Sequence, residues 1–334
     1  MRILVVGGAG YIGSHACKAL ARAGHVPTVI DDLSTGNEWA VRWGSLVRGC
    51  IGDRDLVARV LRDEKIDGVM HFAASAYVGE SMVQPQKYFR NNVVNSLSLF
   101  DSMREAGVTN IVFSSTCATY GEPLRLPLDE SHPQNPVNPY GESKLFIEKV
   151  LRWYGEAYGL RWSTLRYFNA AGADVDAEIG EVHDPEPHLI PLAIQAAMGE
   201  GPEMQILGTD YATPDGTAIR DYIHVEDLAR AHVLAARHLA SGGESGAFNL
   251  GTGKGYSVRE IIATVERHTG QRVPAVEKGR RAGDPKCLIA GAERAGEVLG
   301  WRPAHDLDSI VATALAWERR KTQLSRPILQ KEKP

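Results

Sequence analysis

The stretch ILVVGGAGYIG at residues 3–13 decides the fold of this chain. Its first four residues are apolar and predict a short strand, and helical periodicity follows over residues 14–23. Between them lies a turn that contains Gly7, Gly8, Gly10 and Gly13. A strand, a glycine turn and a helix in this order let the backbone approach a pyrophosphate, whose charge rests on the helix amino terminus. The segment therefore predicts a dinucleotide site.

One acidic residue further along the chain indicates which dinucleotide binds. A second apolar run, residues 26–30, ends in Asp31. An acid in this position accepts hydrogen bonds from the adenosine ribose and repels the additional phosphate of NADP. We therefore expect the cofactor to be NAD.

A second motif, NPYGESK at residues 138–144, places Tyr140 and Lys144 four residues apart. Pro139 marks the start of a helix, so the two side chains share one face and the ammonium lies beside the phenol. A phenol ionises near pH ~10, and a neighbouring cation favours its charged form. We expect Lys144, helped by the positive nicotinamide ring of an oxidised cofactor, to lower the pKa of Tyr140 and make it a base. The spacing alone also fits a packed tyrosine and a solvated lysine on an ordinary amphipathic helix.

Composition narrows the class of protein. With 334 residues, of which 43% are hydrophobic, the chain can bury a substantial core as one large domain or two modest ones. A net charge of −4 provides no field for nucleic acid or an anionic membrane. The first apolar run is too short for a signal peptide and no run reaches transmembrane length, so we expect a cytoplasmic protein. We expect no metal site, and reduced thiols at the scattered cysteines Cys17, Cys50, Cys117 and Cys287.

Strand and helix alternate through the first half of the chain. Strand candidates and helical stretches follow one another at residues 54–64, 68–72, 86–106, 111–115, 140–158 and 162–167. This alternation predicts an α/β fold with a doubly wound parallel sheet of the Rossmann type.

The pattern loosens after residue 169, where loops are expected at 172–187 and 208–218. We expect an NAD-binding Rossmann domain over residues 1–170, to which a crossing segment near 220–250 returns with a helix over 225–239. A smaller carboxy-terminal lobe, which would bind the substrate, is expected over residues 171–219 and 251–330.

Six segments in order, GGAGYIG, HFAA, SSTCATYG, NPYGESK, RYFNAAGA and DGTAIRDYIHVEDLA, make the chain resemble the extended short-chain dehydrogenase/reductase family. The resemblance covers about residues 1–320, nearly the whole chain. Within the family, HFAA followed by VGES, together with the last two segments, resembles the branch of sugar-nucleotide 4-epimerases.

The resemblance implies a set of residues around the cofactor. Those implied under the pyrophosphate are Gly7, Gly10, Tyr11, Ile12 and Gly13. Those implied around the adenosine are Asp31, Asp32, Leu33, Ser34, Thr35, Gly36, Asp53 and Arg54. The nicotinamide side is implied to be lined by Phe72, Ala73, Ala74, Ala76, Asn91, Phe168, Tyr140 and Lys144. Many members of the family carry a lysine where this chain has Ala76, which predicts a different grip on the cofactor.

The resemblance also implies residues around a UDP-sugar. These are Thr116, Asn169, His188, Leu189, Leu207, Arg220, Tyr222, Arg281, Asp284 and Leu288. Two guanidinium groups suit a diphosphate because each binds two oxygens at fixed geometry. Leu288 is implied to control the room near the sugar's 2-substituent. Taken singly, Arg220 also fits a surface salt bridge, His188 a helix start, and Leu288 a strand residue that faces the core.

The activity implied is the interconversion of UDP-galactose and UDP-glucose. Tyr140, directly or through Thr116, takes the proton from the sugar's 4-hydroxyl while hydride passes from carbon-4 to tightly held NAD. The 4-keto sugar turns over and receives the hydride on its other face. The resemblance further implies a homodimer formed by the helices at 86–106 and 140–158.

Three other functions compete with this one. A nucleotide-sugar 4,6-dehydratase places an Asp-Glu pair after the catalytic threonine, whereas Cys117 and Ala118 follow Thr116 here. A sister epimerase that acts on a UDP-pentose, UDP-uronate or UDP-N-acetylhexosamine stays open. A non-catalytic protein that senses NAD is disfavoured because Tyr140 and Lys144 are both present.

Overall fold

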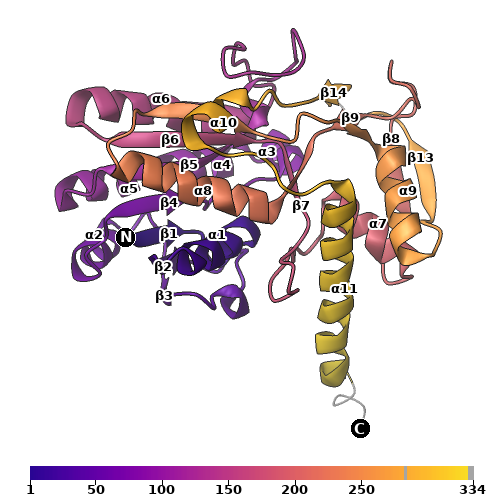
Figure 1. Ribbon diagram of the computed structural model, residues 1–334, viewed down its shortest axis with the longest axis horizontal. Helices are drawn as coiled ribbons and strands as arrows, with labels where there is room; N and C mark the ends of the chain where they lie inside the picture. The colour runs from indigo at the N-terminus through magenta and orange to yellow at the C-terminus, as the bar shows by residue number, and fades with distance from the viewer. Residues whose placement is uncertain (282–283, 330–334) are drawn as a thin grey trace.

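A seven-stranded parallel sheet organises the larger part of the molecule in the computed structural model, which describes residues 1–281 and 284–329, with side chains as far as residue 322 (Figure 1). Its strand order is β11-β6-β5-β4-β1-β2-β3. From β1 the chain first adds strands on one side and then, from β4 onward, on the other, as expected for a doubly wound fold. The strands are β1 (Arg2–Val6), β2 (Val26–Asp31), β3 (Ser45–Arg48), β4 (Gly68–His71), β5 (Asn110–Thr116), β6 (Arg161–Tyr167) and β11 (Gly246–Leu250).

Helices cover both faces of this sheet because its central strands alternate apolar side chains in both directions. Ile3 and Val5 of β1 pack in a core with α1 (Tyr11–Arg22) and α8 (Val225–Ala240). Leu4 and Val6 pack in a second core on the other face, with helices α2 (Arg54–Asp63), α5 (Asn95–Ala106) and α6 (Pro139–Tyr158). Burial on both faces accounts for the nearly continuous apolar run in β1.

A smaller group of elements lies at one end of the sheet, on the right in Figure 1. Its core lies between α7 (Leu189–Ala197), α9 (Val258–Thr269) and α11 (Leu307–Leu329). Short strands complete it as three small sheets: β7 (Asn169–Ala171) with β10 (Tyr222–His224), β8 (Met204–Leu207) with β13 (Ala275–Lys278), and β9 (Ile219–Arg220) with β12 (Tyr256–Ser257) and β14 (Cys287–Leu288).

Most of the elements predicted from the sequence are present, within one or two residues at their ends. The helix expected at 86–106 is a succession of α4 (Pro85–Tyr88), a π-helical segment η2 (Phe89–Val94) and α5. It is preceded by α3 (Val78–Val83), and short 3₁₀ turns occur at η1 (Glu38–Ala40) and η3 (Cys117–Thr119). Helix α1 begins at Tyr11, inside the glycine segment, rather than at residue 14.

Two strands of the main sheet were not predicted from periodicity. β3 and β11 are its edge strands, and β11 comes from the segment that crosses back at residues 220–250. Helix α10 (Glu293–Leu299), expected in the smaller lobe, instead packs its Ala295 and Leu299 into the core shared with α8. The larger domain therefore gains elements from the carboxy-terminal third of the chain.

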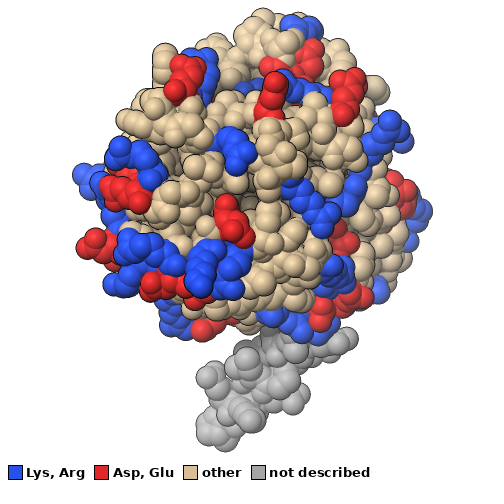
Figure 2. Space-filling model, turned by 60° about the vertical axis from the view of Figure 1, so that its left-hand side comes forward, with Lys and Arg blue, Asp and Glu red and all other residues tan. Residues whose placement is uncertain are grey.

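The surface carries both signs of charge. Lys and Arg side chains are interspersed with Asp and Glu side chains on the face shown in Figure 2. Among the helices of the described residues, none combines the length and the apolar character that a membrane crossing requires.

Candidate active site

The glycine turn leaves no room for side chains. Gly7 has a φ of +78°, and a Cβ there would lie 2.6 Å from the backbone nitrogen of Ala73. A Cβ on Gly13 would lie 2.2 Å from the carbonyl oxygen of Gly7. Gly10 is the N-cap of α1 and has no side chain with which to cap the first turn. The amides of that turn therefore point out of the carboxyl edge of the sheet, where helix termini bind phosphate.

Asp31, the last residue of β2, connects this turn to the adenosine side. Its carboxylate accepts hydrogen bonds from the amides of Ala9 (3.0 Å) and Leu33 (2.9 Å). Burial raises the pKa of this carboxyl, and the two amides oppose that shift. A Cβ on Gly36 would lie 2.9 Å from the Asp31 carboxylate. The predicted adenosine segment, whose remaining members are Asp32, Ser34 and Thr35, is thus folded against the acid.

Two residues predicted near the adenosine have structural partners elsewhere. Asp53 is the N-cap of α2 and accepts a hydrogen bond from the Leu56 amide at 3.0 Å. Arg54 pairs with Glu105 and lies 3.5 Å from Asp101. Both side chains therefore have partners within the protein, and their implied role beside the adenosine stays a prediction.

The segment implied beside the nicotinamide follows β4 and lies next to the glycine turn. The amides of Phe72 and Ala73 both donate to the carbonyl of Val6, at 2.8 and 3.1 Å. The same segment contains Ala74 and Ala76. Asn91, on η2, donates to the hydroxyl of Ser75 in this segment at 3.2 Å. The chain therefore brings the β4 loop and the glycine turn to one place, and the implied role of this loop beside the nicotinamide stays a prediction.

Thr116, Tyr140 and Lys144 come together at the carboxyl end of β5. Thr116 ends that strand, and the other two lie on the first turns of α6, which Asn138 caps by accepting from the Gly141 amide at 2.8 Å. The Thr116 side chain lies near enough to the Tyr140 phenol to favour its ionised form and so lowers its pKa. All three side chains belong to buried residues. The alternative of a solvated lysine is therefore wrong.

Burial controls the protonation of this group. It raises the pKa of Tyr140 well above the ordinary value, and the Thr116 side chain only partly offsets that effect. Burial also lowers the pKa of Lys144 to about 7, although the Glu148 carboxylate opposes the shift. The Lys144 ammonium donates to the Ser114 carbonyl at 2.8 Å and lies 4.7 Å from the centre of the Phe113 ring. Burial of the phenol is thus the largest influence on its pKa, and the expectation that Lys144 and the nicotinamide ring together lower the pKa of Tyr140 stays a prediction.

A buried ion pair lies behind this group and was not predicted. Glu148, one helical turn after Lys144, accepts from the Arg166 guanidinium, and their side chains are 6% and 8% exposed. Arg166 also donates to the Tyr120 hydroxyl at 3.0 Å. Arg166 is on β6, so the pair ties α6 to the sheet directly under the catalytic candidates.

Some of the residues implied around the sugar nucleotide lie together on neighbouring strands. Arg220 of β9 pairs with Asp284, and its side chain is only 12% exposed, so it is not a surface salt bridge. Leu288 of β14 lies beside Arg220 in the parallel register and packs against a small core made of Tyr120, Leu128, Phe168 and Ala290. Asn169 donates to the Asp221 carbonyl at 3.1 Å. Tyr222 is buried on β10, Leu207 ends β8, Leu189 begins α7, and Arg281 is exposed.

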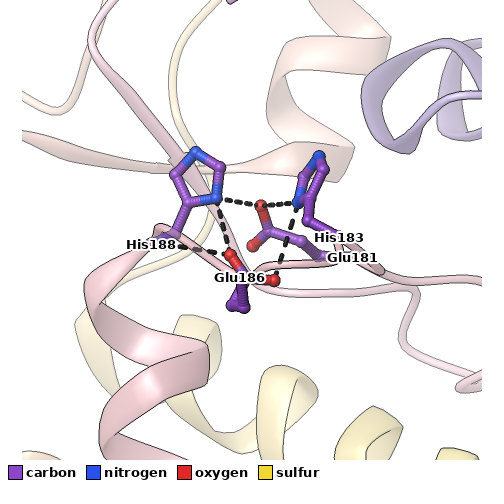
Figure 3. Close-up of side chains that lie close together, drawn as sticks. All are labelled: Glu181, His183, Glu186 and His188. Carbon is purple, nitrogen blue, oxygen red and sulfur yellow. Dashed lines mark hydrogen bonds and ion pairs between the residues drawn. The ribbon is translucent and has the colours of Figure 1, made fainter. Parts of the chain in front are cut away.

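His188 belongs to a cluster that sequence reasoning missed. Its ring nitrogen Nδ1 lies 2.7 Å from Glu181 and 2.8 Å from Glu186, and His183 completes the group (Figure 3). One nitrogen or carboxylate oxygen from each of the four side chains, the atoms that could ligate a metal ion, lie within 4.8 Å of one another. The spacing E-x-H-x-x-E-x-H at residues 181–188 was the available signal, but it lies in a loop whose path the sequence did not predict.

Fold and site together define an NAD-binding α/β enzyme, and the chain belongs to the NAD dependent epimerase/dehydratase family, which its residues 3–251 match. Its relatives include UDP-glucose 4-epimerase of Azospirillum brasilense, 53% identical over 324 residues that cover 96% of this chain and 93% of the relative. A solved structure of UDP-glucose 4-epimerase from Brucella ovis in complex with NAD is 54% identical, with a TM-score of 0.93 and coverage of 94% and 97% of the two chains. The UDP-Glc/GlcNAc 4-epimerase of Campylobacter jejuni is 40% identical, with a TM-score of 0.83 and coverage of 96% and 99%.

Proposed function

We propose that this chain is a UDP-glucose 4-epimerase, which interconverts UDP-galactose and UDP-glucose with tightly bound NAD. The observation that carries the proposal is the buried group of Thr116, Tyr140 and Lys144 at the same sheet edge as the glycine turn. Relatives that are about half identical over nearly the full length and are named UDP-glucose 4-epimerase support it.

The residues present fit NAD. The turn at Gly7 and Gly13 is so close to neighbouring backbone that only glycine is accommodated, which leaves the helix amides accessible to a pyrophosphate. Asp31 offers a carboxylate to the ribose. When bound, NAD supplies a hydride acceptor that becomes a hydride donor, so the net redox change is zero.

The protein's own groups handle the proton. Tyr140 accepts the proton of the sugar's 4-hydroxyl and later returns it, and the neighbouring Thr116 hydroxyl offers a relay between the phenol and the sugar. Because burial raises the pKa of Tyr140, the phenolate needs a nearby positive charge when the proton moves. Lys144 is the cation built into this site, and Glu148 behind it favours its charged form.

The assay is direct. We expect the purified protein to retain NAD and to convert UDP-galactose to UDP-glucose without added cofactor, measured by separation of the two nucleotide sugars. Turnover that requires stoichiometric NAD and accumulates NADH would instead identify a dehydrogenase. Conversion of a UDP-pentose or UDP-uronate in preference to UDP-galactose would identify a sister epimerase.

The division of labour predicted from the sequence is part of the proposal. The Rossmann domain, residues 1–170, binds the cofactor, and the smaller lobe, residues 171–219 and 251–330, binds the UDP-sugar. Asp284 of the smaller lobe supports this assignment, because it holds the guanidinium of Arg220, at the start of the crossing segment, in an orientation suited to phosphate oxygens.

We also propose a homodimer formed through α6 and the segment from α4 to α5. Four large apolar side chains on these helices are exposed by 42–59%: Phe89, Val94, Phe146 and Trp153. Neighbouring Met82 and Val83 on α3 are exposed by 60% and 76%. Apolar side chains gathered on adjacent helices are typical of a surface that a partner covers.

A further inference from the structure

The four side chains of Glu181, His183, Glu186 and His188 form a compact cluster in the loop that leads into α7. Both histidines turn Nδ1 toward the carboxylates, while the second ring nitrogen, Nε2, of each points away from them toward the same side (Figure 3). The ring centres are 5.1 Å apart. Within the described residues, neither Nε2 has a hydrogen-bond partner in the protein. The cluster therefore presents two N–H donors on the same side, from rings inclined at 50° to each other.

The carboxylates make these donors cationic. The Glu181 and Glu186 side chains are only 6% and 7% exposed, so they lie beneath the rings and are shielded from water. Burial alone lowers the pKa of an imidazole, but the two carboxylates outweigh it and raise the pKa of His183 to about 9 and that of His188 to about 10. Both rings are imidazolium at neutral pH.

The distances favour ion pairs over a metal site. The His188 nitrogen lies 2.7 and 2.8 Å from its two carboxylate oxygens, as in charge-assisted hydrogen bonds. Ligands on a tetrahedral zinc with bonds of about 2.0 Å are separated by roughly 3.3 Å. A proton therefore fits between the His188 nitrogen and its two carboxylates better than a metal ion does, while His183 Nδ1 lies farther away, 3.2 Å from Glu181 and 3.6 Å from Glu186.

Neighbouring residues place the cluster beside the cofactor turn. The Tyr11 hydroxyl, in the first turn of α1, donates to the Gly172 carbonyl at 2.6 Å, and the charges of Glu181 and Glu186 help to raise the pKa of Tyr11. The ring of Tyr77, which follows the β4 loop, meets the His183 ring edge-on at 6.0 Å. Because His188 is also the N-cap of α7, the amides of the first turn of that helix add positive potential beside its ring.

Other cations near the site are already engaged. Lys18 contacts the carboxylates of Asp174, Asp176 and Glu178, and Arg220 pairs with Asp284. We propose that His183 and His188 form a twin-imidazolium site that binds a phosphate group of a ligand held between the glycine turn and α7. The inference rests on the proposed function, which brings two such groups here, the pyrophosphate of NAD and the diphosphate of the UDP-sugar.

The test compares His183→Gln with wild type in two binding measurements. In the first, UDP and uridine are titrated by calorimetry, since uridine has the same base and ribose but no phosphate. In the second, the rate of NAD loss is followed on dilution. We expect affinity for UDP to fall roughly tenfold or more with uridine unaffected, or NAD to dissociate roughly tenfold faster. The first result assigns the site to the sugar nucleotide and the second to the dinucleotide.

The matched control is His268→Gln. His268 is on α9 and pairs with Asp308 at 2.9 Å, so it has a similar carboxylate contact outside this loop. We expect its UDP and NAD binding to equal wild type. Unchanged UDP and NAD binding in a folded His183→Gln protein would overturn the proposal, as would an equal loss of UDP and uridine affinity or zinc found bound to the wild-type protein.

Wild-type protein offers a measurement that does not depend on folding of the variant. In protein labelled with ¹⁵N-histidine, the Nε2 resonances of His183 and His188 should shift on addition of UDP or on exchange of NAD, and stay in place with uridine. No shift in either arm would contradict the proposal. Turnover of UDP-galactose is measured in parallel, so a protein that binds phosphate here without epimerising contradicts only the proposed function.

Discussion

Burial raises the pKa of Tyr140 and lowers the pKa of Lys144, so it favours the neutral form of each side chain. At Lys144 the protein opposes the effect of burial, because the Glu148 carboxylate favours the ammonium and Arg166 holds Glu148 in place. Burial alone therefore favours the protonated phenol, and ionisation of Tyr140 needs a positive charge nearby, while the pKa of Lys144 is about 7. We therefore expect proton transfer by Tyr140 to depend on the charge of Lys144.

Replacing Tyr140 by Phe removes the acid/base group and keeps the ring. We expect turnover of UDP-galactose to fall by about 10² to 10⁴, the usual contribution of a positioned acid/base, while bound NAD is retained. Lys144→Ala should lose activity and NAD together, since the resemblance also places this lysine at the nicotinamide ribose. The measurements are initial rates and NAD content per subunit. Near-normal turnover of Tyr140→Phe would show that another group is the base.

Leu288 tests substrate choice at the same scale. It packs against Tyr120, Leu128 and Phe168, next to the strand that carries Arg220. We expect strong preference for UDP-galactose and weak turnover of UDP-N-acetylgalactosamine, which Leu288→Ala raises and Leu288→Tyr abolishes. A difference of one methylene in pocket fit changes selectivity by roughly tenfold or more. Equal ratios of kcat/KM for the two sugars in all three proteins would place the gate elsewhere.

At the scale of elements, a loop joins the two binding regions. Residues 172–188 run from the end of β7 to α7 and are fastened to α1 by Lys18, whose ammonium lies 2.7 Å from Asp174 and 2.7 Å from Glu178. The side chains of Lys18 and Asp174 are 6% and 0% exposed. The helix expected to hold the pyrophosphate therefore also positions the loop that carries His183 and His188.

Lys18→Ala should destabilise the protein strongly. Removing one partner of a buried ion pair leaves the other charge uncompensated, which costs about 3 to 5 kcal/mol. Arg22→Ala is the control, because Arg22 contacts Asp176 on the same loop with both side chains more than half exposed, and such pairs contribute less than ~1 kcal/mol. Urea denaturation measures both. Equal losses of unfolding free energy in the two variants would contradict a stabilising role for the buried ion pair of Lys18 and Asp174.

The histidine cluster predicts a dependence of stability on pH. Folding raises the pKa of His183 to about 9 and that of His188 to about 10, from 6.5, so their stabilisation is complete below 6.5 and is lost as pH rises through the higher values. Glu181, Glu186, Tyr11 and Tyr77 face the pair, so the comparison must isolate one histidine.

For this we compare the free energy of unfolding of wild type and His183→Gln. The difference should be largest near pH ~6 and shrink toward pH ~9.5 as wild-type His183 loses its proton. A difference that is constant over this range would show that His183 stabilises the loop through packing rather than charge.

At the scale of the whole molecule, the exposed apolar side chains of α6 and of the segment from α4 to α5 predict assembly. We expect light scattering to give a mass about twice the chain mass of 36.4 kDa at micromolar concentration. Phe146→Glu should yield a single chain, because the charge would be buried in the interface. Leu124→Glu, at a side chain 77% exposed on a loop outside these helices, should leave the dimer intact. A wild-type mass near that of one chain contradicts the proposal.

The sequence by itself determined the parts of this protein whose signals are local. The strand, glycine turn and helix at residues 2–22, the acid at Asp31 and the helix that carries Tyr140 and Lys144 all follow from patterns that are local in the chain. Central strands are buried on both faces and keep a clear apolar run. The Rossmann fold and the cofactor could be predicted from these segments, and the type of enzyme from the family resemblance that all six motifs carry together.

Only the tertiary structure decided what depends on residues distant in the chain. The edge strands β3 and β11 are recognisable by the neighbours they pair with rather than by their own short sequences. The raised pKa of Tyr140 results from burial, which no spacing reveals. The pairing of Lys18 with Asp174, and the position of the His183 cluster beside Tyr11 and Tyr77, require α1 and a loop more than 150 residues away to meet. Desolvation and charge pairing depend on what surrounds a group in space, and only the folded chain specifies those surroundings.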